Sequence, residues 1–267
     1  MDVLVCEPEY FDLKYSINPW MKHLENSVNR NLAYKQWENL VKTLEKMGAT
    51  PQIMKGHPEL PDIVFTANAG FYFKENDVKK IILSNFKHPE RQPEKEIYKN
   101  WFENNGFECL FFPESYNFEG AGDVLTKGKS KEIYHGHGFR SDFDVNHWNI
   151  TSFLIHPLQL VNPHFYHLDT CFCPLNRNYI LIWEEAFLES DVNYLMSHDV
   201  HLLKIPPQDA YKFACNAVNI DDCVLIPSGC PETGEILKNA GFDVYETDMS
   251  EYIKSGGACK CLTLSLS

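Results

Sequence analysis

Three segments of the chain share one order of apolar and polar positions: apolar residues at helical spacing, then a glycine, then a short apolar run. The segments are LVKTLEKMGATPQIM (residues 40–54), YKNWFENNGFECLFF (98–112) and TGEILKNAGFDVYET (233–247). Their glycines, Gly48, Gly106 and Gly241, stand where the residue after a helix adopts the left-handed conformation. The pattern therefore predicts three helices, each ending at its glycine and each followed by a strand.

A second apolar run follows each of these strands after a short polar stretch. The runs are LPDIVFTANAGFYF (60–73), FEGAGDVL (118–125) and SGGACKCLTLSL (255–266); PLQLVNPHFYHLDTCFCPL (157–175) and VHLLKIPPQDAYKFACNAVNI (200–220) fit the same second half. We therefore count five units of strand, connection and strand with helices between them, and the helix is least clear around WNITSFLI (148–155). Such units stack radially or side by side because each covers its neighbour's apolar face, and their equivalent loops then meet at one end. The predicted fold class is α/β, in one domain of five repeated units.

Polar side chains occupy the equivalent positions of the five units. They are Asp62 and Asn68, Glu119 and Asp123, His167 and Asp169, Asn216, and Cys261. Turns are polar in any case, but these residues stand among apolar strands and small residues such as Gly70, Gly120 and Gly257. Polar groups in such surroundings become partly buried, where they must be hydrogen-bonded or used in chemistry. The pattern predicts one site to which all five units contribute.

Composition narrows the kinds of partner. The 267 residues include 37 Asp and Glu against 24 Lys and Arg, a formal net charge of −13. Nucleic acid and anionic membranes favour basic surfaces, so neither is an expected partner, whereas a cationic small-molecule substrate is compatible with this charge. The N-terminal stretch MDVLVCEPEYFDLKY has no basic segment and no long apolar run, so no signal peptide is predicted. No stretch approaches the roughly 20 apolar residues of a membrane helix.

Nine cysteines, an odd number without an export signal, indicate reduced thiols in a cytoplasmic protein. Two of them, Cys259 and Cys261, lie in SGGACKCLTL near the end of the chain. A zinc site could use this pair or HFYHLDTCFC (164–173), but structural zinc usually takes cysteines two to four residues apart, and both pairs here are C-x-C. The other interpretation is a nucleophile: glycines let the backbone before Cys261 approach a ligand. The adjacent Lys260 would lower the thiol pKa, although strand geometry turns its side chain the other way.

A proton-transfer group would have to stand beside such a thiol. In YHLDTCF, His167, Asp169 and Cys171 share one face if the segment is a strand, so His167 and Asp169 would point together. A lone histidine in an apolar segment is more often a core residue. The adjacent carboxylate and the separate thiol favour a general acid and base.

The carboxylates of the predicted site indicate the substrate. Asp62, Glu119, Asp123 and Asp169 would share a small space, where they repel one another unless a cation lies among them. A planar guanidinium satisfies two carboxylates at once. Its carbon is therefore the electrophile that this set of residues predicts.

With these residues the chain resembles the guanidino-group-modifying hydrolases, which include arginine deiminase, dimethylarginine dimethylaminohydrolase and the arginine dihydrolases. The stretches PDIVFTANAG, FEGAGD, FYHLDTCFCPL, FACNAV and GGACKCLTL carry the resemblance, INPWM, HPERQ and GFRSD add to it, and it covers essentially the whole chain. The resemblance implies the pentein fold, a five-bladed α/β propeller with pseudo-fivefold symmetry, in agreement with the five units. It also implies catalysis that needs no metal or organic cofactor.

The resemblance assigns the catalytic roles. Cys261 matches the nucleophile, since the family pattern places Met or Leu and then Ser or Thr after it, and His167 matches the acid and base. Glu119 and Asp169 resemble the carboxylates that hold the guanidinium. Cys259 is then a neighbour without a catalytic role.

The same resemblance assigns substrate binding. Arg91 in HPERQ and Arg140 in GFRSD look like the residues that bind the substrate's α-carboxylate, and Asn18 in INPWM looks like part of a loop over the site. With Asp62 and Asp123, which the repeat contributes, the expected substrate-binding set is Asn18, Asp62, Asn68, Arg91, Asp123, Arg140 and Asp169.

Two positions depart from the deiminase pattern. Glu119 lies one residue further from Asp123 than the deiminase glutamate, with Gly120 in its place, and a local bulge would restore the geometry. Asn68 stands where deiminases carry an aspartate, and an asparagine here is similar to the dihydrolases. Because an amide donates as well as accepts hydrogen bonds, Asn68 suits both arginine and citrulline, and a second hydrolytic step becomes feasible.

The predicted activity is that of an arginine dihydrolase, which converts arginine to ornithine, two ammonia and carbon dioxide through a covalent thiouronium on Cys261. The alternatives are an arginine deiminase or a dimethylargininase that stops at citrulline, an amidinotransferase, a non-catalytic arginine-binding protein and a zinc-binding module. Related long proteins carry further domains, whereas this chain ends at Ser267, so we expect a stand-alone catalytic domain. The sequence leaves the oligomeric state open, a homo-oligomer included.

Overall fold

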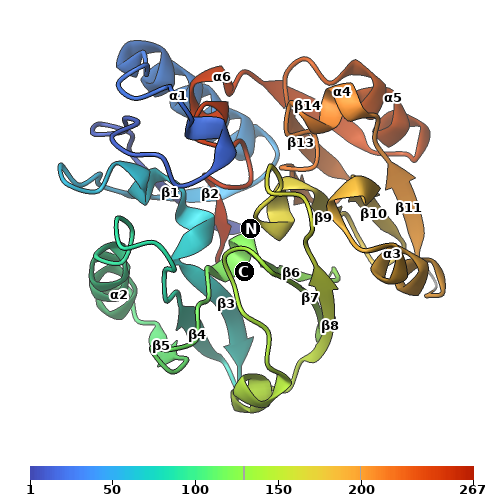
Figure 1. Ribbon diagram of the computed structural model, residues 1–267, viewed down its shortest axis with the longest axis horizontal. Helices are drawn as coiled ribbons and strands as arrows, with labels where there is room; N and C mark the ends of the chain where they lie inside the picture. Colours follow the sequence, from blue (N-terminus) through green and yellow to red (C-terminus); the bar gives the residue numbers. More distant parts are fainter. Residues whose placement is uncertain (129, 199) are drawn as a thin grey trace.

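Five small sheets surround a central axis, near which both ends of the chain lie (Figure 1). The computed structural model describes residues 1–128, 130–198 and 200–267, and the sheets are counted within these ranges. The sheets, each written from its inner to its outer strand, are β15–β1–β2 (Leu264–Ser265, Asp2–Cys6, Thr50–Met54), β3–β4–β5 (Gly70–Glu75, Val78–Leu83, Glu108–Phe111), β6–β7–β8 (Val124–Thr126, Glu132–His137, Leu154–Gln159), β9–β10–β11 (Phe172–Pro174, Tyr179–Ile182, His201–Lys204) and β12–β13–β14 (Val218–Ile220, Cys223–Pro227, Asp243–Thr247). In each sheet the inner strand is antiparallel to the middle strand, and the outer strand is parallel to it. The five-bladed α/β propeller is confirmed.

A crossover joins the middle strand of each sheet to its parallel neighbour. Four crossovers contain an α-helix: α1 (Arg30–Lys46), α2 (Glu94–Asn104), α3 (Glu189–Met196) and α5 (Pro231–Asn239). The crossover between β7 and β8 contains the 3₁₀ segment Val145–Ile150 instead, where Asp144 accepts a hydrogen bond from the Asn146 amide. Asparagine, threonine and serine favour such local turns over a continued helix, so the least clear helix of the sequence is not an α-helix. Two one-turn helices, α4 (Pro207–Ala210) and α6 (Ser250–Ile253), lie in the segments before β12 and β15.

The glycine signals of the sequence mark real helix ends. Helix α1 begins after Asn29, whose side chain accepts the Leu32 amide, and its apolar face is buried. Gly48, Gly106 and Gly241 follow α1, α2 and α5 with φ angles of 93°, 79° and 92°. The three predicted helix–glycine–strand segments are therefore confirmed.

The apolar core is shared between neighbouring sheets. One buried cluster joins the sheet of β1 to that of β13, a second joins the sheets of β1 and β4, and a third joins those of β4 and β7. The largest cluster runs through the three sheets from β7 to β13. Each sheet thus covers apolar surface of the next one, as the repeat predicts.

A turn precedes each inner strand, and these turns lie at the same end of the axis. They carry the polar residues that the repeat placed at equivalent positions: Asp62, Asn68, Glu119, Asp123, His167, Asp169, Asn216 and Cys261. Each of these side chains belongs to a residue that is at most 3% exposed. Burial of the predicted polar set is confirmed.

Within the described ranges, no helix has both the length and the apolar character that a membrane crossing requires. All nine cysteines are free.

Candidate active site

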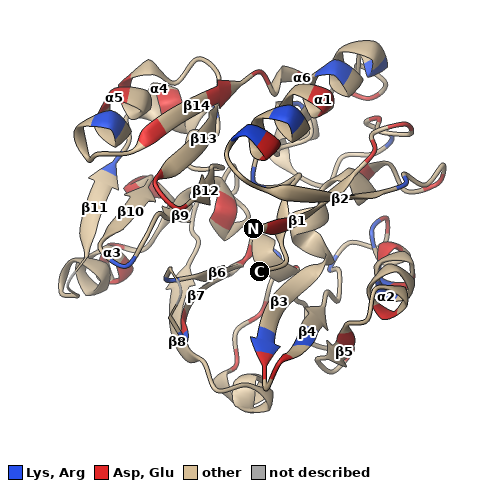
Figure 2. Cartoon of the chain, turned by 180° about the vertical axis from the view of Figure 1, so that it is seen from behind, with Lys and Arg blue, Asp and Glu red and all other residues tan. Residues whose placement is uncertain are grey.

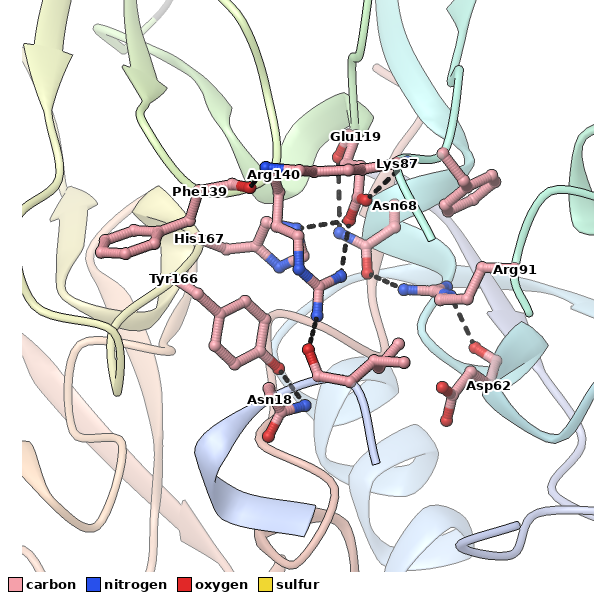
Figure 3. A network of polar contacts seen from close by, with 12 residues as sticks. Asn18, Asp62, Asn68, Lys87, Arg91, Glu119, Phe139, Arg140, Tyr166 and His167 are labelled. Carbon is pink, nitrogen blue, oxygen red and sulfur yellow. Dashed lines mark hydrogen bonds and ion pairs between the residues drawn. The ribbon is translucent and has the colours of Figure 1, made fainter. Parts of the chain in front are cut away.

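A small cavity opens next to the turns that precede the inner strands. Its lining is Ile17, Asn18, Asp62, Phe65, Asn68, Arg91, Arg140, Tyr166, His167, Ser255, Gly256 and Cys261. The cavity volume is about 10 Å³, which is room for roughly one water molecule. The side chains of the site therefore fill most of it themselves, and they do so through a network of charged contacts (Figure 3).

Cys261 lies in a turn after α6, not on a strand as the sequence suggested; β15 starts only at Leu264. Its Sγ accepts a hydrogen bond from Asn216 Nδ2 at 3.1 Å and lies 3.3 Å from Asp169 Oδ2, to which the thiol donates. Burial, followed by the negative charge of Asp169, raises the pKa of the Cys261 thiol well above its ordinary value. The hydrogen bond from Asn216 acts in the opposite direction. The surroundings of Cys261 in the free protein therefore favour the thiol over the thiolate, with Asp169 as the acceptor of its hydrogen bond.

His167 and Asp169 do not share a strand face. The 3₁₀ turn Leu168–Thr170 follows His167, and the strand begins at Phe172, so the predicted alternation is wrong. The two side chains take different partners: Asp169 contacts Cys261, whereas His167 Nε2 lies 2.7 Å from Glu119 Oε2.

Glu119 is the carboxylate partner of His167. It also accepts a hydrogen bond from Arg140 Nη1 at 3.1 Å. Burial by itself raises the pKa of Glu119, but the charges of Arg140 and His167 outweigh it and hold that pKa well below its usual range. An ionised carboxylate beside the imidazole stabilises the imidazolium that proton transfer produces.

Two glycines next to Glu119 explain its displaced position in the sequence. Gly120 has a φ of 59° and packs against the backbone of Gly70, where a Cβ would come within 2.7 Å of its atoms. A Cβ on Gly122 would overlap the amide of Asn68. The left-handed turn at Gly120 brings the Glu119 carboxylate to His167 in spite of the one-residue shift.

Asn68 lies between an arginine and the Glu119 backbone. Its Oδ1 accepts from Arg91 Nη1 at 2.9 Å, and its Nδ2 lies 3.4 Å from the Glu119 carbonyl (Figure 3). Arg91 is held in turn by Glu94, which accepts from Nε and Nη2 at 2.8 and 2.7 Å, and by the carbonyl of Asp62. Arg91 thus has a buried carboxylate partner that the sequence did not reveal.

Arg140 lies across the cavity. Its Nη2 donates to the carbonyl of Ile17 at 3.1 Å, and its guanidinium lies over the Tyr166 ring at 4.6 Å. Asn18 also lines the cavity, and it donates to Tyr166 Oη and to the carbonyl of Ser255, which fixes its segment beside the site.

The two remaining predicted residues differ in their access to the cavity. Asp62 lines the cavity and accepts a hydrogen bond from Tyr15 Oη at 2.9 Å. Burial raises the pKa of Asp62, although the positive charge of Arg91 lowers it. Asp123 does not line the cavity: its carboxylate accepts from Ser141 Oγ and from the Leu168 amide, behind His167. Glu119 and Asp169 are likewise outside the lining of this small cavity, and Asp123 lies behind them against the turn that carries His167.

Sequence reasoning missed several residues of the site. Tyr166, Ser255, Tyr15 and Glu94 contact the predicted residues, and Asn216 was found by the repeat but received no role. Tyr166 lies within the stretch FYHLDTCFCPL and Ser255 directly precedes GGACKCLTL, and this was their only signal. Among the described residues, no group of three or more His, Cys, Asp or Glu side chains is arranged to hold a metal ion.

Known proteins are similar to this chain over nearly its whole length. The family model for eukaryotic N,N-dimethylarginine dimethylhydrolase matches residues 7–267. The bifunctional arginine dihydrolase/ornithine cyclodeaminase ArgZ of Synechocystis sp. is 40% identical over 98% of this chain, and the N(G),N(G)-dimethylarginine dimethylaminohydrolase of Mycobacterium tuberculosis is 33% identical over 97% of it. The match covers 37% of the first protein and 83% of the second, so the chain spans little more than a third of its cyanobacterial relative.

A solved structure extends the similarity to three dimensions. The product-bound N-terminal domain of ArgZ, described as an arginine dihydrolase from the ornithine-ammonia cycle in cyanobacteria, superposes with a TM-score of 0.93 at 38% identity. The match covers 100% of this chain and 97% of that domain.

Proposed function

The chain belongs to the N,N-dimethylarginine dimethylhydrolase family, and we propose that it is a cysteine-dependent guanidino hydrolase that acts on L-arginine. In this proposal it is an arginine dihydrolase, which converts arginine to ornithine, two ammonia and carbon dioxide. The match to nearly all of the N-terminal domain of ArgZ, a domain described as an arginine dihydrolase, supports this choice over a one-step enzyme. We propose only the arginine dihydrolase activity for this chain, and not the ornithine cyclodeaminase activity that the name of ArgZ also includes.

Arg140 has to move when substrate enters, because the free site has room for about one water molecule. Its guanidinium contacts Glu119 in the free protein, at a place where the guanidinium of a substrate could be held. Once displaced, Arg140 is free to bind the substrate's α-carboxylate, the role that the family resemblance implies for it. Glu119 is then available to the substrate as well as to His167.

Activation of Cys261 follows from the charge of the bound substrate. The free thiol is protonated because burial and Asp169 disfavour the thiolate. A guanidinium next to the sulfur favours the thiolate. Asp169, 3.3 Å from the sulfur and with its pKa raised by burial to about 7, is placed to take the proton.

The thiolate then attacks the guanidinium carbon and forms a C–S bond. His167 donates a proton to the departing nitrogen, which leaves as ammonia, and then removes a proton from the water that attacks the thiouronium carbon. Glu119, which keeps its contact with His167 and holds the substrate guanidinium in the place that Arg140 has left, stabilises the cationic form of His167. Breaking the C–S bond releases citrulline from Cys261.

The orientation of the Asn68 amide is the observation that favours a second step. Its oxygen is occupied by Arg91 at 2.9 Å, whereas its nitrogen has only the long contact of 3.4 Å to the Glu119 carbonyl. An N–H donor is therefore available to the ureido oxygen of bound citrulline, and a carboxylate at this position would offer an acceptor instead. Repeating the attack on the ureido carbon gives ornithine, carbon dioxide and the second ammonia.

Product stoichiometry tests the proposal. Purified protein is incubated with L-arginine, and ornithine, citrulline and ammonia are measured together, with the Cys261→Ser variant as control. Ornithine with two ammonia per arginine supports the dihydrolase. Citrulline with one ammonia would assign a deiminase and would contradict the role of Asn68.

A dimethylargininase is the second candidate, favoured by the family description and by the mycobacterial relative. It would release dimethylamine and citrulline from dimethylarginine in a single step. The same assay with dimethylarginine separates the two functions, because an arginine dihydrolase produces ornithine from arginine under conditions where dimethylamine release is slow or absent.

We propose a cytoplasmic location, which is compatible with nine free thiols. The acidic net charge argues against nucleic acid and anionic membranes as partners. A homo-oligomer is compatible with the fold, and size-exclusion chromatography with light scattering measures the oligomeric state.

A further inference from the structure

We propose that Asn216 is a positioning residue that holds the nucleophile turn and stabilises the thiolate of Cys261. Asn216 lies in the turn before β12, in a different sheet from the cysteine, and it is completely buried. The inference rests on Cys261 being the nucleophile, as in the proposed function, but not on which guanidino compound is the substrate.

The oxygen of the Asn216 side chain holds the backbone of the nucleophile turn. Oδ1 accepts hydrogen bonds from the amides of Ala258, Lys260 and Cys261 at 3.0, 3.1 and 3.1 Å. The Asn216 carbonyl accepts a further bond from the Lys260 amide at 3.2 Å. The nucleophile turn lies before β15 and has no strand partner, so these hydrogen bonds satisfy its backbone amides instead. They also fix the position from which the Cys261 side chain projects.

The nitrogen of the same amide reaches the sulfur. Nδ2 donates to Cys261 Sγ at 3.1 Å and to the carbonyl of Asp169 at 3.0 Å. If the Asn216 amide were rotated by 180°, its NH₂ group would face three backbone N–H donors. The surrounding donors therefore determine which position the oxygen takes. The N–H that faces Sγ is therefore a consequence of the fold.

This N–H interacts differently with the two forms of the cysteine. The thiol already donates its proton to Asp169, so the bond from Asn216 persists when that proton leaves and becomes charge-assisted. The neighbouring Lys260 does not supply such a bond, because its Nζ donates to the carbonyl of Thr263 at 3.3 Å. Among the hydrogen bonds of the described chain, Asn216 makes the side-chain N–H contact with this sulfur.

Asn216 acts on the sulfur from outside the cavity. It is absent from the cavity lining, and its side chain is already occupied by the nucleophile turn, the Asp169 carbonyl and the sulfur. Its replacement should lower kcat and leave KM within about threefold, since transition-state stabilisation is lost without a ground-state contact. A residue of the substrate pocket would change KM as well.

Two variants separate the two parts of the inference. Asn216→Asp keeps an oxygen for the three backbone amides but replaces the donor beside the sulfur by an acceptor. Asn216→Ala removes both. Asn85→Ala is the matched control, because Asn85 is also a buried asparagine that holds backbone carbonyls, in a segment without contact to Cys261.

The pH dependence of Cys261 alkylation by iodoacetamide measures the thiol pKa directly, with the modified peptide identified by mass spectrometry. We expect Asn216→Ala to raise the apparent pKa by about 1–2 units, which lowers the alkylation rate at neutral pH by roughly 10–100-fold. Asn216→Asp should raise it further, because a carboxylate then faces the thiolate. Asn85→Ala should keep the parent profile, and far-UV circular dichroism checks that each variant is folded.

An unchanged alkylation profile in folded Asn216→Asp would overturn the inference, even if Asn216→Ala failed to fold. The readout uses no arginine, so its result is separate from that of the stoichiometry assay. A shifted thiol pKa in a protein that turns over neither arginine nor dimethylarginine would keep the inference for Asn216 and reject the proposed function.

Discussion

The two ends of the propeller axis differ in size and in the groups that line them. The cavity at Cys261 holds about 10 Å³, and ion-paired and hydrogen-bonded side chains fill the space around it. A hollow of about 990 Å³ runs along the inner strands toward the other end, and it is lined by β9, β12, the end of β6, and Met1 and Ser267. Figure 2 shows the molecule from behind the view of Figure 1, where the inner strands β6, β9 and β12 carry no charged residue.

Two adjacent residues line the two different cavities. Cys261 lines the small cavity and Lys260 lines the large hollow. The other charged residues of the hollow, Arg177, Asp221 and Asp222, are exposed to solvent. Cavity size therefore does not identify the site here. Buried, oriented polar groups do so, because electrostatic stabilisation is strongest where water is excluded.

The largest expected effect contrasts two buried cysteines, one on the small cavity and one in the core. Cys261→Ser should lower kcat by about 10⁴-fold or more, since a hydroxyl is a far weaker nucleophile than a thiolate. Cys259→Ala should stay within about threefold of the parent, because Cys259 packs in a buried apolar cluster. Ammonia release from arginine measures both. Equal losses in the two variants would contradict the assignment of the nucleophile.

A change of product is the next expected effect. Asn68→Asp should slow the second step by roughly 10²-fold, because the donor to the ureido oxygen is lost, so citrulline accumulates. Asn219→Asp, at the large hollow, is the control and should leave the product ratio unchanged. The citrulline-to-ornithine ratio measures the effect, and a parent-like ratio in Asn68→Asp would remove Asn68 from the mechanism.

Asp169→Asn should abolish turnover and yet stabilise the fold at alkaline pH. Burial raises the pKa of Asp169 from 3.8 to about 7, so in the range between these values the unfolded chain is ionised while the folded chain keeps its proton. Stability is therefore lost as pH rises through this range, by an amount on the order of 4 kcal/mol above pH 7. The variant should unfold at a higher temperature than the parent at pH 8 and at the same temperature near pH 3. A destabilised variant at pH 8 would show that contacts of the carboxylate outweigh its burial.

The smallest expected effect belongs to Lys260. Its positive charge lowers the pKa of Asp169, opposing the effect of burial, so Lys260→Met should move the acidic limb of kcat/KM to higher pH by less than about one unit. Activity should fall near pH 6.5 and stay within about threefold of the parent at pH 8.5. Arg177→Met, also at the large hollow, should leave the pH profile in place. A large loss at all pH values would link the two ends of the axis more closely than the structure indicates.

Much of the fold could be predicted from the order of residues along the chain. The helix–glycine–strand segments are local signals. Gly48, Gly106 and Gly241 mark the ends of their helices because each glycine adopts the left-handed conformation that terminates a helix. The repeat of these segments led to the five sheets. The third crossover was unclear because its polar and β-branched residues carry no helical signal, and it contains a 3₁₀ segment.

The members of the candidate site were predictable for the same reason, since equivalent turns of a repeat meet at one end. Their partners were not. Local spacing paired His167 with Asp169, but the turn at Leu168 separates them, and His167 contacts Glu119 instead.

The sequence by itself determined the repeat, the helix ends and the set of polar residues that become buried, because each depends on short-range periodicity and on turn residues. Tertiary structure decided which of them touch. Glu119 and His167 are 48 positions apart, Asn216 and Cys261 are 45, and Asp169 and Cys261 are 92. Such contacts arise only when the five sheets close around the axis, since the angle between neighbouring sheets and the packing of the shared clusters set where each turn ends.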